Sequence, residues 1–446
     1  MSITIKNIFR KPGNSVPLWF FAFVPYKVGE SLLIMLLPLF IVQVVGGNVA
    51  DFAKINALTS LVGMLGFIVW GNLSDWTGYR RIFLLMGFLG FAICTSMLSF
   101  GNNISQVLLL TALGGFFMAA VTPVGSALVL DSFPEKQWSK FFGRFYQITG
   151  WSFVGSLLFG MSWLTFASKW FSTVAIMRGL LLFAGVVSSL SLILCLLWIP
   201  EPKIVRRHRK FSPKLIGQLT VGVIERRTIF YPARVLYFVF NRNSFKQVFQ
   251  PLGSPLGRYY LCSILLFFAF SVVFVSFPIF LTDTLKATNA QVFLIALVKS
   301  AIESWLYVPV GHRVNQNPGI KLLAQAIALR CGIFGIFAFL ALMPPAPINL
   351  VFIGLTHILT GVTWAAISVS SSTTVGLLAG KDKEGSAIGF YNAIIGAAGA
   401  LGSLGSGYLS ATFGYSVCFG TGALLAGLTS VWLWRLHPVV SSKVSQ

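Results

Sequence analysis

Apolar runs of about 20 residues recur along the whole chain, and short polar segments separate them. A helix of about 20 apolar residues crosses a hydrocarbon core roughly 30 Å thick. The runs are continuous and rich in Leu, Phe and Gly, without the alternation of an outer-membrane barrel. The pattern predicts an all-α polytopic membrane protein with twelve spans, at about 17–45, 52–71, 82–100, 105–130, 142–165, 173–199, 258–282, 290–311, 321–343, 347–376, 386–412 and 415–435.

The composition agrees with this pattern. Of the 446 residues, 56% are hydrophobic and only 10% are charged, whereas a soluble domain is about 25% charged. The five cysteines fall inside predicted spans and form no CxxC pair, which excludes a disulfide framework or a zinc site by spacing. We therefore predict no metal and no cofactor. The first apolar run is too long for a signal peptide and contains Lys27 and Glu30, so we predict an uncleaved first span.

The net charge of +22 indicates the topology. Residues 201–258 hold 12 Lys and Arg against 2 acids, and the N-terminus is also basic. Because basic loops stay in the cytoplasm, both termini and this loop are predicted to be cytoplasmic, in a multi-pass protein of the plasma or inner cell membrane. The basic loop is predicted to lie on anionic lipid, and nucleic acid is not a predicted partner. The predicted segments are 1–16 (N-terminal segment), 17–199 (six-helix bundle), 200–257 (central loop), 258–435 (six-helix bundle) and 436–446 (tail).

Three internal matches support a duplication of the six-helix unit. Chance can supply one such match, but three at corresponding places predict two related halves. The offset is 246 residues for the first two pairs and 240 for the weaker third. The pairs are GFFMAAV with GVTWAAI (115–121 and 361–367), GRFYQITG with GFYNAIIG (143–150 and 389–396), and GNLSDWTGYRR with GHRVNQNPGIK (71–81 and 311–321).

The segment GNLSDWTGYRR resembles the loop signature G-x-x-x-D-x-x-G-x-[RK]-[RK] of the major facilitator superfamily. The run LDSFPEKQWSKFFGRFYQ (130–147) resembles the connection from helix 4 to helix 5 in that superfamily. The resemblance implies twelve transmembrane helices in two pseudo-symmetric bundles that work by alternating access. The second copy departs from the signature, with Asn315 in place of the acid. Residues 111–120 lack the R-x-x-Q-G arginine of many proton-coupled members, and helix 5 lacks the G-P-x-x-G-G signature of drug/proton antiporters.

The resemblance also implies a conformational latch. In the family, the aspartate of the signature, here Asp75, forms a contact with the start of the eleventh transmembrane helix, and this contact breaks when the cavity opens inward. Independently, Gly78 permits a tight turn, and Asp75 can accept N–H groups at a helix start or pair with a neighbouring arginine. The alternative is a solvated turn that only anchors helices 2 and 3. The predicted latch residues are Gly71, Asp75, Gly78, Arg80, Arg81, Asp131 and Glu135.

Charged residues inside two spans are the first candidates for a transport site. Lys27 and Glu30 are three residues apart in the first predicted span. Lys299 and Glu303 are four residues apart in the eighth predicted span, with Tyr307 on the same face. A charge at the bilayer centre costs about 2.5–3.5 kcal/mol, so such residues face a cavity or a partner. Either the pairs bind substrate and carry coupling protons, or they neutralise each other and fix helix packing.

Other candidates are single residues in predicted cavity helices or near the cytoplasmic gate. The tenth predicted span contains the hydroxyl-rich run 360–374. Its residues Trp364, Thr363 and Ser368 either contact a polar ligand or form hydrogen bonds within or between helices. His357 is either a titrating group or a hydrogen-bonded packing residue. Arg330, in the ninth predicted span, either pairs with a neighbouring side chain or extends to the membrane–water interface. Five residues near the starts of the fifth and eleventh predicted spans are candidates for the cytoplasmic gate or the site: Arg144, Tyr146, Gln147, Tyr391 and Asn392.

Together these features predict a monomeric secondary active transporter for a small polar or amphipathic organic solute, coupled to protons. Its predicted partners are the small-molecule substrate, a proton or other coupling ion, and the lipid bilayer. An uncoupled facilitator and an exporter of lipophilic compounds are the alternatives with the same fold. An enzyme is not predicted, because the five aspartates are scattered rather than clustered for Mg²⁺-diphosphate. A nucleotide-driven pump is excluded, because the sequence has no G-x-x-x-x-G-K-[ST] loop.

Overall fold

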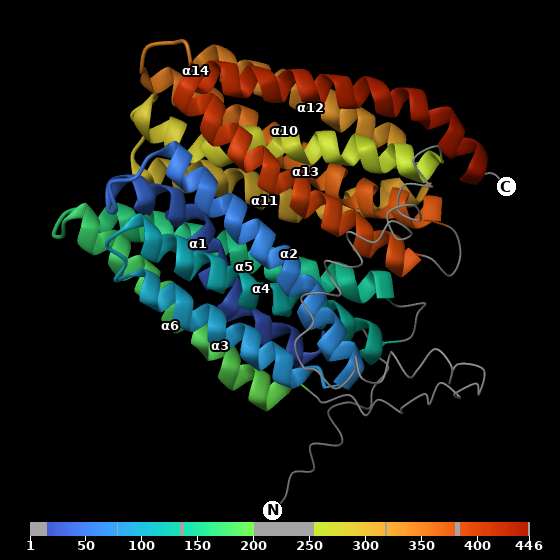
Figure 1. Ribbon diagram of the computed structural model, residues 1–446, viewed down its shortest axis with the longest axis horizontal. Coiled ribbons are helices and arrows are strands. Elements are labelled where there is room, and N and C mark those ends of the chain that lie inside the picture. Colours follow the sequence, from blue (N-terminus) through green and yellow to red (C-terminus); the bar gives the residue numbers. More distant parts are fainter. Residues whose placement is uncertain are drawn as a thin grey trace, which may run out of the picture.

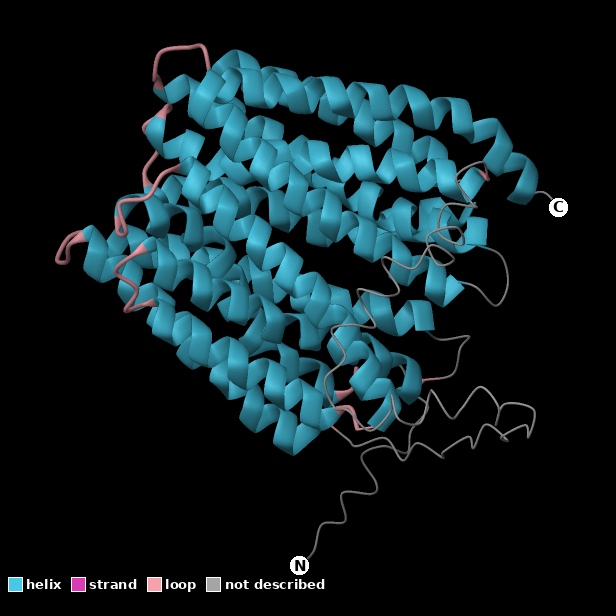
Figure 2. Cartoon of the chain, in the orientation of Figure 1, coloured by secondary structure: helices cyan, strands magenta, loops and turns pink. Residues whose placement is uncertain are grey.

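The computed structural model describes residues 16–77, 79–133, 138–199, 254–316, 319–379 and 384–444. Within these ranges the chain is helical with short connections (Figure 2), which confirms the all-α prediction. We call the first six long helices, with the short 3-10 helix before them, the N-terminal bundle. It comprises η2 (Leu18–Phe23), α1 (Val24–Gln43), α2 (Val49–Thr77), α3 (Arg81–Leu98), α4 (Ile104–Ser132), α5 (Trp138–Ala167) and α6 (Thr173–Trp198).

The helices after residue 254 form what we call the C-terminal bundle. Its last element, α14, bends at Gly414, where φ is 83° and ψ is 169°. This conformation is not helical, so α14 consists of two helices, 384–413 and 415–444. The second continues to Val444, beyond the predicted limit at 435. The elements are α10 (Pro255–Asp283), α11 (Asn289–Gln316), α12 (Gly319–Leu340), α13 (Pro347–Ala379) and α14 (Glu384–Val444).

The helices have the length and composition of membrane spans. In the part of the chain that the structure describes, ten helices are long and apolar enough to cross a membrane. The longest of these stretches, Ile394–Pro438, contains both halves of α14 and is long enough for two crossings. The protein is therefore a multi-pass membrane protein.

The two bundles lie side by side, with the N-terminal bundle (blue to green) below and the C-terminal bundle (yellow to red) above in Figure 1. Five short connections gather at one end of the molecule (Figure 2). We call this the loop end and the opposite end the terminal end. The connections are 44–48, 99–103, 168–172, 284–288 and 341–346.

Two loops at this end repeat each other at a spacing of 240 residues, the same offset as the third sequence match. The first follows α1 and the second follows α10. In each loop, one residue has a positive φ, 79° at Gly46 and 56° at Lys286. The hydrogen bonds that close the loops also correspond, from Gly47 N to Ile41 O and from Ala287 N to Leu281 O, both 2.9 Å. This correspondence supports a duplicated bundle.

The hydrophobic core has two parts that differ in which bundles they join. One cluster combines residues of both bundles, for example Phe40 of α1 with Phe280 and Phe293 of α10 and α11. The other contains buried residues of the N-terminal bundle alone, including Phe20 and Phe145. The apolar contact between the bundles is therefore concentrated in one region.

The loop-end half of the molecule contributes to this contact. Gln43 at the end of α1 and Asn289 at the start of α11 exchange two hydrogen bonds of 2.9 Å. Asn56 Nδ2 of α2 donates to Ser403 Oγ of α14, also at 2.9 Å. Nearby, α14 approaches α2 so closely at Gly407 that an added Cβ would lie 2.5 Å from a carbon of α2. The bundles are thus joined at the loop end.

Candidate functional site

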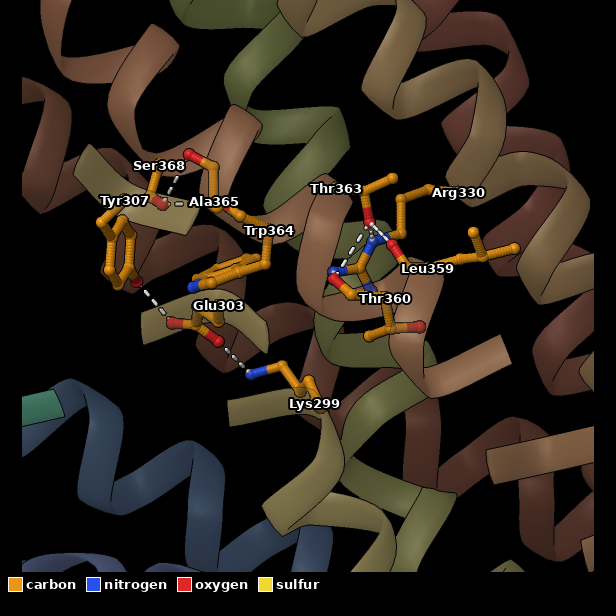
Figure 3. Close-up of polar contacts among 10 residues, drawn as sticks. All are labelled: Lys299, Glu303, Tyr307, Arg330, Leu359, Thr360, Thr363, Trp364, Ala365 and Ser368. Atoms are coloured by element: carbon orange, nitrogen blue, oxygen red, sulfur yellow. Dashed lines mark hydrogen bonds and ion pairs between the residues drawn. The ribbon is translucent and has the colours of Figure 1, made fainter. Parts of the chain in front are cut away.

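The clearest polar group of the C-terminal bundle is a row on one face of α11. Lys299, Glu303 and Tyr307 are spaced by four residues, so their side chains stack along the helix. Lys299 Nζ lies 2.9 Å from Glu303 Oε2, and Tyr307 donates its hydroxyl proton to Glu303 Oε1 (Figure 3). Both carboxylate oxygens therefore have partners, as a charge in this environment requires. The Lys299 side chain is 28% exposed and that of Glu303 is 14% exposed.

An aromatic side chain of α13 faces this row. The ammonium of Lys299 lies 5.6 Å from the centre of the Trp364 ring, within the range of a cation–π contact. Ser368 lies one turn further along α13, where its hydroxyl donates to the Trp364 carbonyl at 2.6 Å. The close approach of the helices depends on Gly361, where an added Cβ would lie 2.5 Å from the Lys299 carbonyl oxygen. Helix packing thus brings Trp364 against Lys299.

A second cation of the C-terminal bundle is fully buried. Arg330 of α12 donates from Nε to Thr363 Oγ1 and from Nη2 to the Thr360 carbonyl, both at 2.7 Å (Figure 3). Its guanidinium carbon also lies 5.3 Å from the ring centres of Phe270 and Phe274. The remaining nitrogen, Nη1, has no hydrogen-bond partner among the described residues. Arg330 is therefore not a lipid-facing residue, and it links α12 to α13 and α10.

The N-terminal bundle repeats the same chemistry on α1. Lys27 Nζ lies 2.5 Å from Glu30 Oε2, and the Tyr26 hydroxyl donates to Glu30 Oε1 at 3.2 Å. Tyr26 is fully buried, and its backbone N–H donates to Ser191 Oγ of α6 at 2.8 Å. Each bundle therefore contains a glutamate whose carboxylate contacts both a lysine and a tyrosine of the same helix.

These groups lie at similar levels along their helices. At the loop end, α1 ends 13 residues after Glu30 and α11 begins 14 residues before Glu303, which places each carboxylate residue roughly 20 Å from that end. Arg330 and Trp364 also lie near the middle of α12 and α13. Of the five ionisable side chains at this level, three are basic and two are acidic, and all lie away from both ends of the bundles.

The structure places His357 in a packed aromatic layer. The ring stacks on Phe277 and Phe337, with centroids 4.9 and 5.6 Å apart. Its Nδ1 lies 2.9 Å from the carbonyl of Ile353 in its own helix. These contacts are those of a buried packing residue, so nothing in the geometry brings His357 to the α11 row.

The gate candidates differ in burial. Tyr146 and Gln147 of α5 are exposed, and so is Asn392 of α14. Tyr391, in contrast, is buried and stacks on Tyr259 of α10. Near the first two, α5 packs closely on α11, where a Cβ added at Gly150 would lie 2.9 Å from Ser304 Oγ.

The predicted latch is described only in part. Arg80 is buried and donates from Nη1 to Ser74 Oγ at 2.7 Å, and Arg81 donates to the Leu196 carbonyl of α6. Both arginines thus bond within the N-terminal bundle. Gly71 lies in α2, but Gly78 and Glu135 and the side chains of Asp75 and Asp131 lie outside the described residues. The latch remains a prediction.

Two sets of contacts were not predicted from the sequence. The first is the pair of Thr360 and Phe274 as contacts of Arg330, and the second is the amide pair of Gln43 and Asn289. A buried arginine needs partners, which is a signal, but their identity depends on helix packing. The amides end and begin helices of different bundles, and nothing in the sequence pairs them.

Comparison with protein families settles the identity of the fold. Residues 19–403 match the family model of the Major Facilitator Superfamily. The chain belongs to this superfamily. It is a transporter and not an enzyme, which confirms the resemblance of the loop signature. A comparison with curated protein sequences gave no match.

Solved structures of superfamily transporters share the fold over nearly the whole chain. A bacterial homologue of the human drug peptide transporters PepT1 and PepT2 is 12% identical, with a TM-score of 0.71, over 96% of this chain and 98% of that one. A mutant of the nucleoside transporter NupG is 13% identical (TM-score 0.68; 94% and 98%). The human organic anion transporter MFSD10 is 17% identical (TM-score 0.64; 93% and 98%). At such identities the likeness concerns the fold alone.

Proposed function

We propose that this transporter is a proton-coupled secondary transporter of a small anionic or zwitterionic organic solute. The observation that carries the proposal is the α11 row, in which one partly buried carboxylate is shared by an ammonium and a phenol beside Trp364. An ionisable group at this depth is a functional candidate by default. The five central ionisable side chains comprise three bases and two acids, and this excess of basic groups favours a solute with a negative group.

The row can link proton uptake to solute binding. When Glu303 takes up a proton, it loses the charge that holds Lys299. The released ammonium, already beside the Trp364 ring, is then free to bind a carboxylate or similar anion of the solute. Loss of the proton restores the internal ion pair and expels the anion. Lys27 and Glu30 on α1 have the same chemistry and extend the site to the second bundle.

The contacts between the bundles support transport by alternating access. The amide pair at Gln43 and Asn289 and the mixed apolar cluster join the bundles at the loop end. We infer that this state is closed at the loop end. The basic segment 200–257 follows the end of α6 and leads into the start of α10, and both of these helix ends lie at the terminal end. By the positive-inside rule we infer that the terminal end faces the cytoplasm of a cell membrane. The state is then closed toward the outside.

Proteoliposome transport tests the coupling. After a screen of small carboxylates and amino acids by thermal shift has identified a solute, Glu303→Gln is expected to abolish accumulation driven by a pH gradient while retaining solute exchange. Glu30→Gln tests the α1 group in the same way. The matched control is Asp51→Asn, which removes a carboxylate paired with Lys54 near the loop end. Accumulation that persists in Glu303→Gln would remove Glu303 from the coupling role.

A further inference from the structure

A polar cavity lies at the loop end, and its lining contains none of Lys299, Glu303 and Tyr307. It has a volume of about 520 Å³, in the range of small-molecule sites. Its lining comes from both bundles and is rich in hydroxyl and amide groups, including Gln43, Ser168, Thr173 and Asn289. The cavity therefore depends on the contact between the bundles that closes the loop end.

The only charged side chain that lines this cavity is Lys286. It is exposed, and it makes no ion pair with any of the described residues. Its backbone is in the left-handed region, with φ of 56°, and it is the only non-glycine residue of the described chain with a positive φ. The equivalent residue of the first repeat, 240 positions earlier, is Gly46.

The contrast between these two residues is informative. A left-handed backbone is unfavourable for a residue with a side chain, and glycine would adopt it without strain. A lysine at the strained position of one loop, where the repeated loop has glycine, indicates a use for the side chain. Lys286 lines a cavity whose other lining residues include hydrogen-bond donors and no carboxylate.

From this geometry we infer that the loop-end cavity is an anion site that binds small organic carboxylates through Lys286. The hydroxyl and amide groups of both bundles supply the remaining hydrogen bonds. Because the lining is shared between the bundles, a bound anion stabilises the state in which the loop end is closed. The site is separate from the proposed coupling residues and does not rest on proton coupling.

Protection of an introduced thiol tests this site without any transport measurement. Ser168→Cys places a thiol in the cavity wall, and the rate of its reaction with the neutral reagent N-ethylmaleimide is followed in nanodiscs at constant ionic strength. The background is the unsubstituted chain, in which four of the five cysteines are buried. Succinate at millimolar concentration is expected to slow the labelling at least threefold, and the neutral isostere succinamide is expected not to slow it.

Variants at the lysine identify the group that binds. In the Ser168→Cys background, Lys286→Gln and Lys286→Gly are expected to remove the protection by succinate, and Lys286→Arg is expected to keep it. Lys286→Gly also relieves the strained φ, so its loss of protection cannot be assigned to misfolding if its melting temperature is unchanged or raised. The matched control is Lys54→Gln, which removes a loop-end charge outside the cavity and is expected to keep the protection.

Three results would overturn the inference. One is the absence of protection by succinate in the Ser168→Cys chain. Another is equal protection by succinamide, which would indicate binding without charge recognition. The third is protection that survives in Lys286→Gln. If Ser168→Cys fails to fold, Thr173→Cys on the same cavity wall replaces it with the same criteria.

Discussion

Breaking the Lys299–Glu303 ion pair from one side is expected to destabilise the protein more than removing both charges. In Lys299→Met, the carboxylate of Glu303 stays at the middle of α11 with only the Tyr307 hydroxyl as a partner. A buried ion pair that loses one member leaves an uncompensated charge, whereas replacing both members is often close to neutral. Lys299→Met/Glu303→Gln is therefore expected to recover much of the loss.

The structure bounds the size of this effect. At the observed separation of 2.9 Å, two unit charges attract each other by roughly 6 kcal/mol at an effective dielectric constant of about 20. Both side chains are partly exposed, at 28% and 14%, so solvent screening reduces this value. We expect a coupling energy of about 2–4 kcal/mol between the two substitutions in a double-mutant cycle.

The cycle is measured as the free energy of unfolding in mixed micelles with increasing dodecyl sulfate, for the wild type, both single variants and the double variant. The control is the same cycle on Asp51 and Lys54, a pair at 3.5 Å whose lysine side chain is 66% exposed. That exposed pair is expected to couple by no more than about 1 kcal/mol. A coupling energy below about 0.5 kcal/mol for Lys299 and Glu303 would refute the argument that the α11 row is electrostatically linked.

Three further sets of variants test the packing around the site and the closure of the loop end. Gly361→Ala is expected to lower stability by about 1–3 kcal/mol, because its Cβ would meet the Lys299 carbonyl oxygen; an unchanged melting temperature would contradict this contact. Arg330→Lys is expected to be less stable than Arg330→Met by about 1–3 kcal/mol. The lysine ammonium keeps a buried charge but cannot donate to Thr363 and Thr360 at once as the guanidinium does, whereas with methionine the Thr363 hydroxyl still bonds within its own helix. Equal melting temperatures of the two variants would contradict this prediction. Gln43→Ala and Asn289→Ala are each expected to widen the distribution of distances between spin labels on loops 168–172 and 284–288. The double variant is expected to widen this distribution no more than either single variant does, because the two amides act as one pair.

The sequence was a good guide to the helices and to most of their ends. The apolar runs predicted where helices occur, because hydropathy marks the residues that lie in lipid. They did not predict that α2 continues to Thr77 rather than ending near 71. Backbone hydrogen bonds carry a helix beyond the bilayer, and hydropathy does not record them.

The candidate site divides in a similar way. The pairs on α1 and α11 could be predicted, because charges three or four residues apart on one helix are neighbours in any packing. The partners of Arg330 could not, since Thr360 lies 30 residues away on another helix. The duplication was visible as an offset of 240 residues, but the contrast between Gly46 and Lys286 acquires its meaning only from the backbone angle.

The bend at Gly414 has a consequence for how the protein is made and how it moves. One residue separates the last two crossings, so the chain there has no slack. We expect the two arms to enter the bilayer as a hairpin, because the polar backbone between them is too short to stay on the side from which the first arm enters. Since the arms share this joint, we also expect a movement of the first arm against α2 to displace the adjoining end of the second.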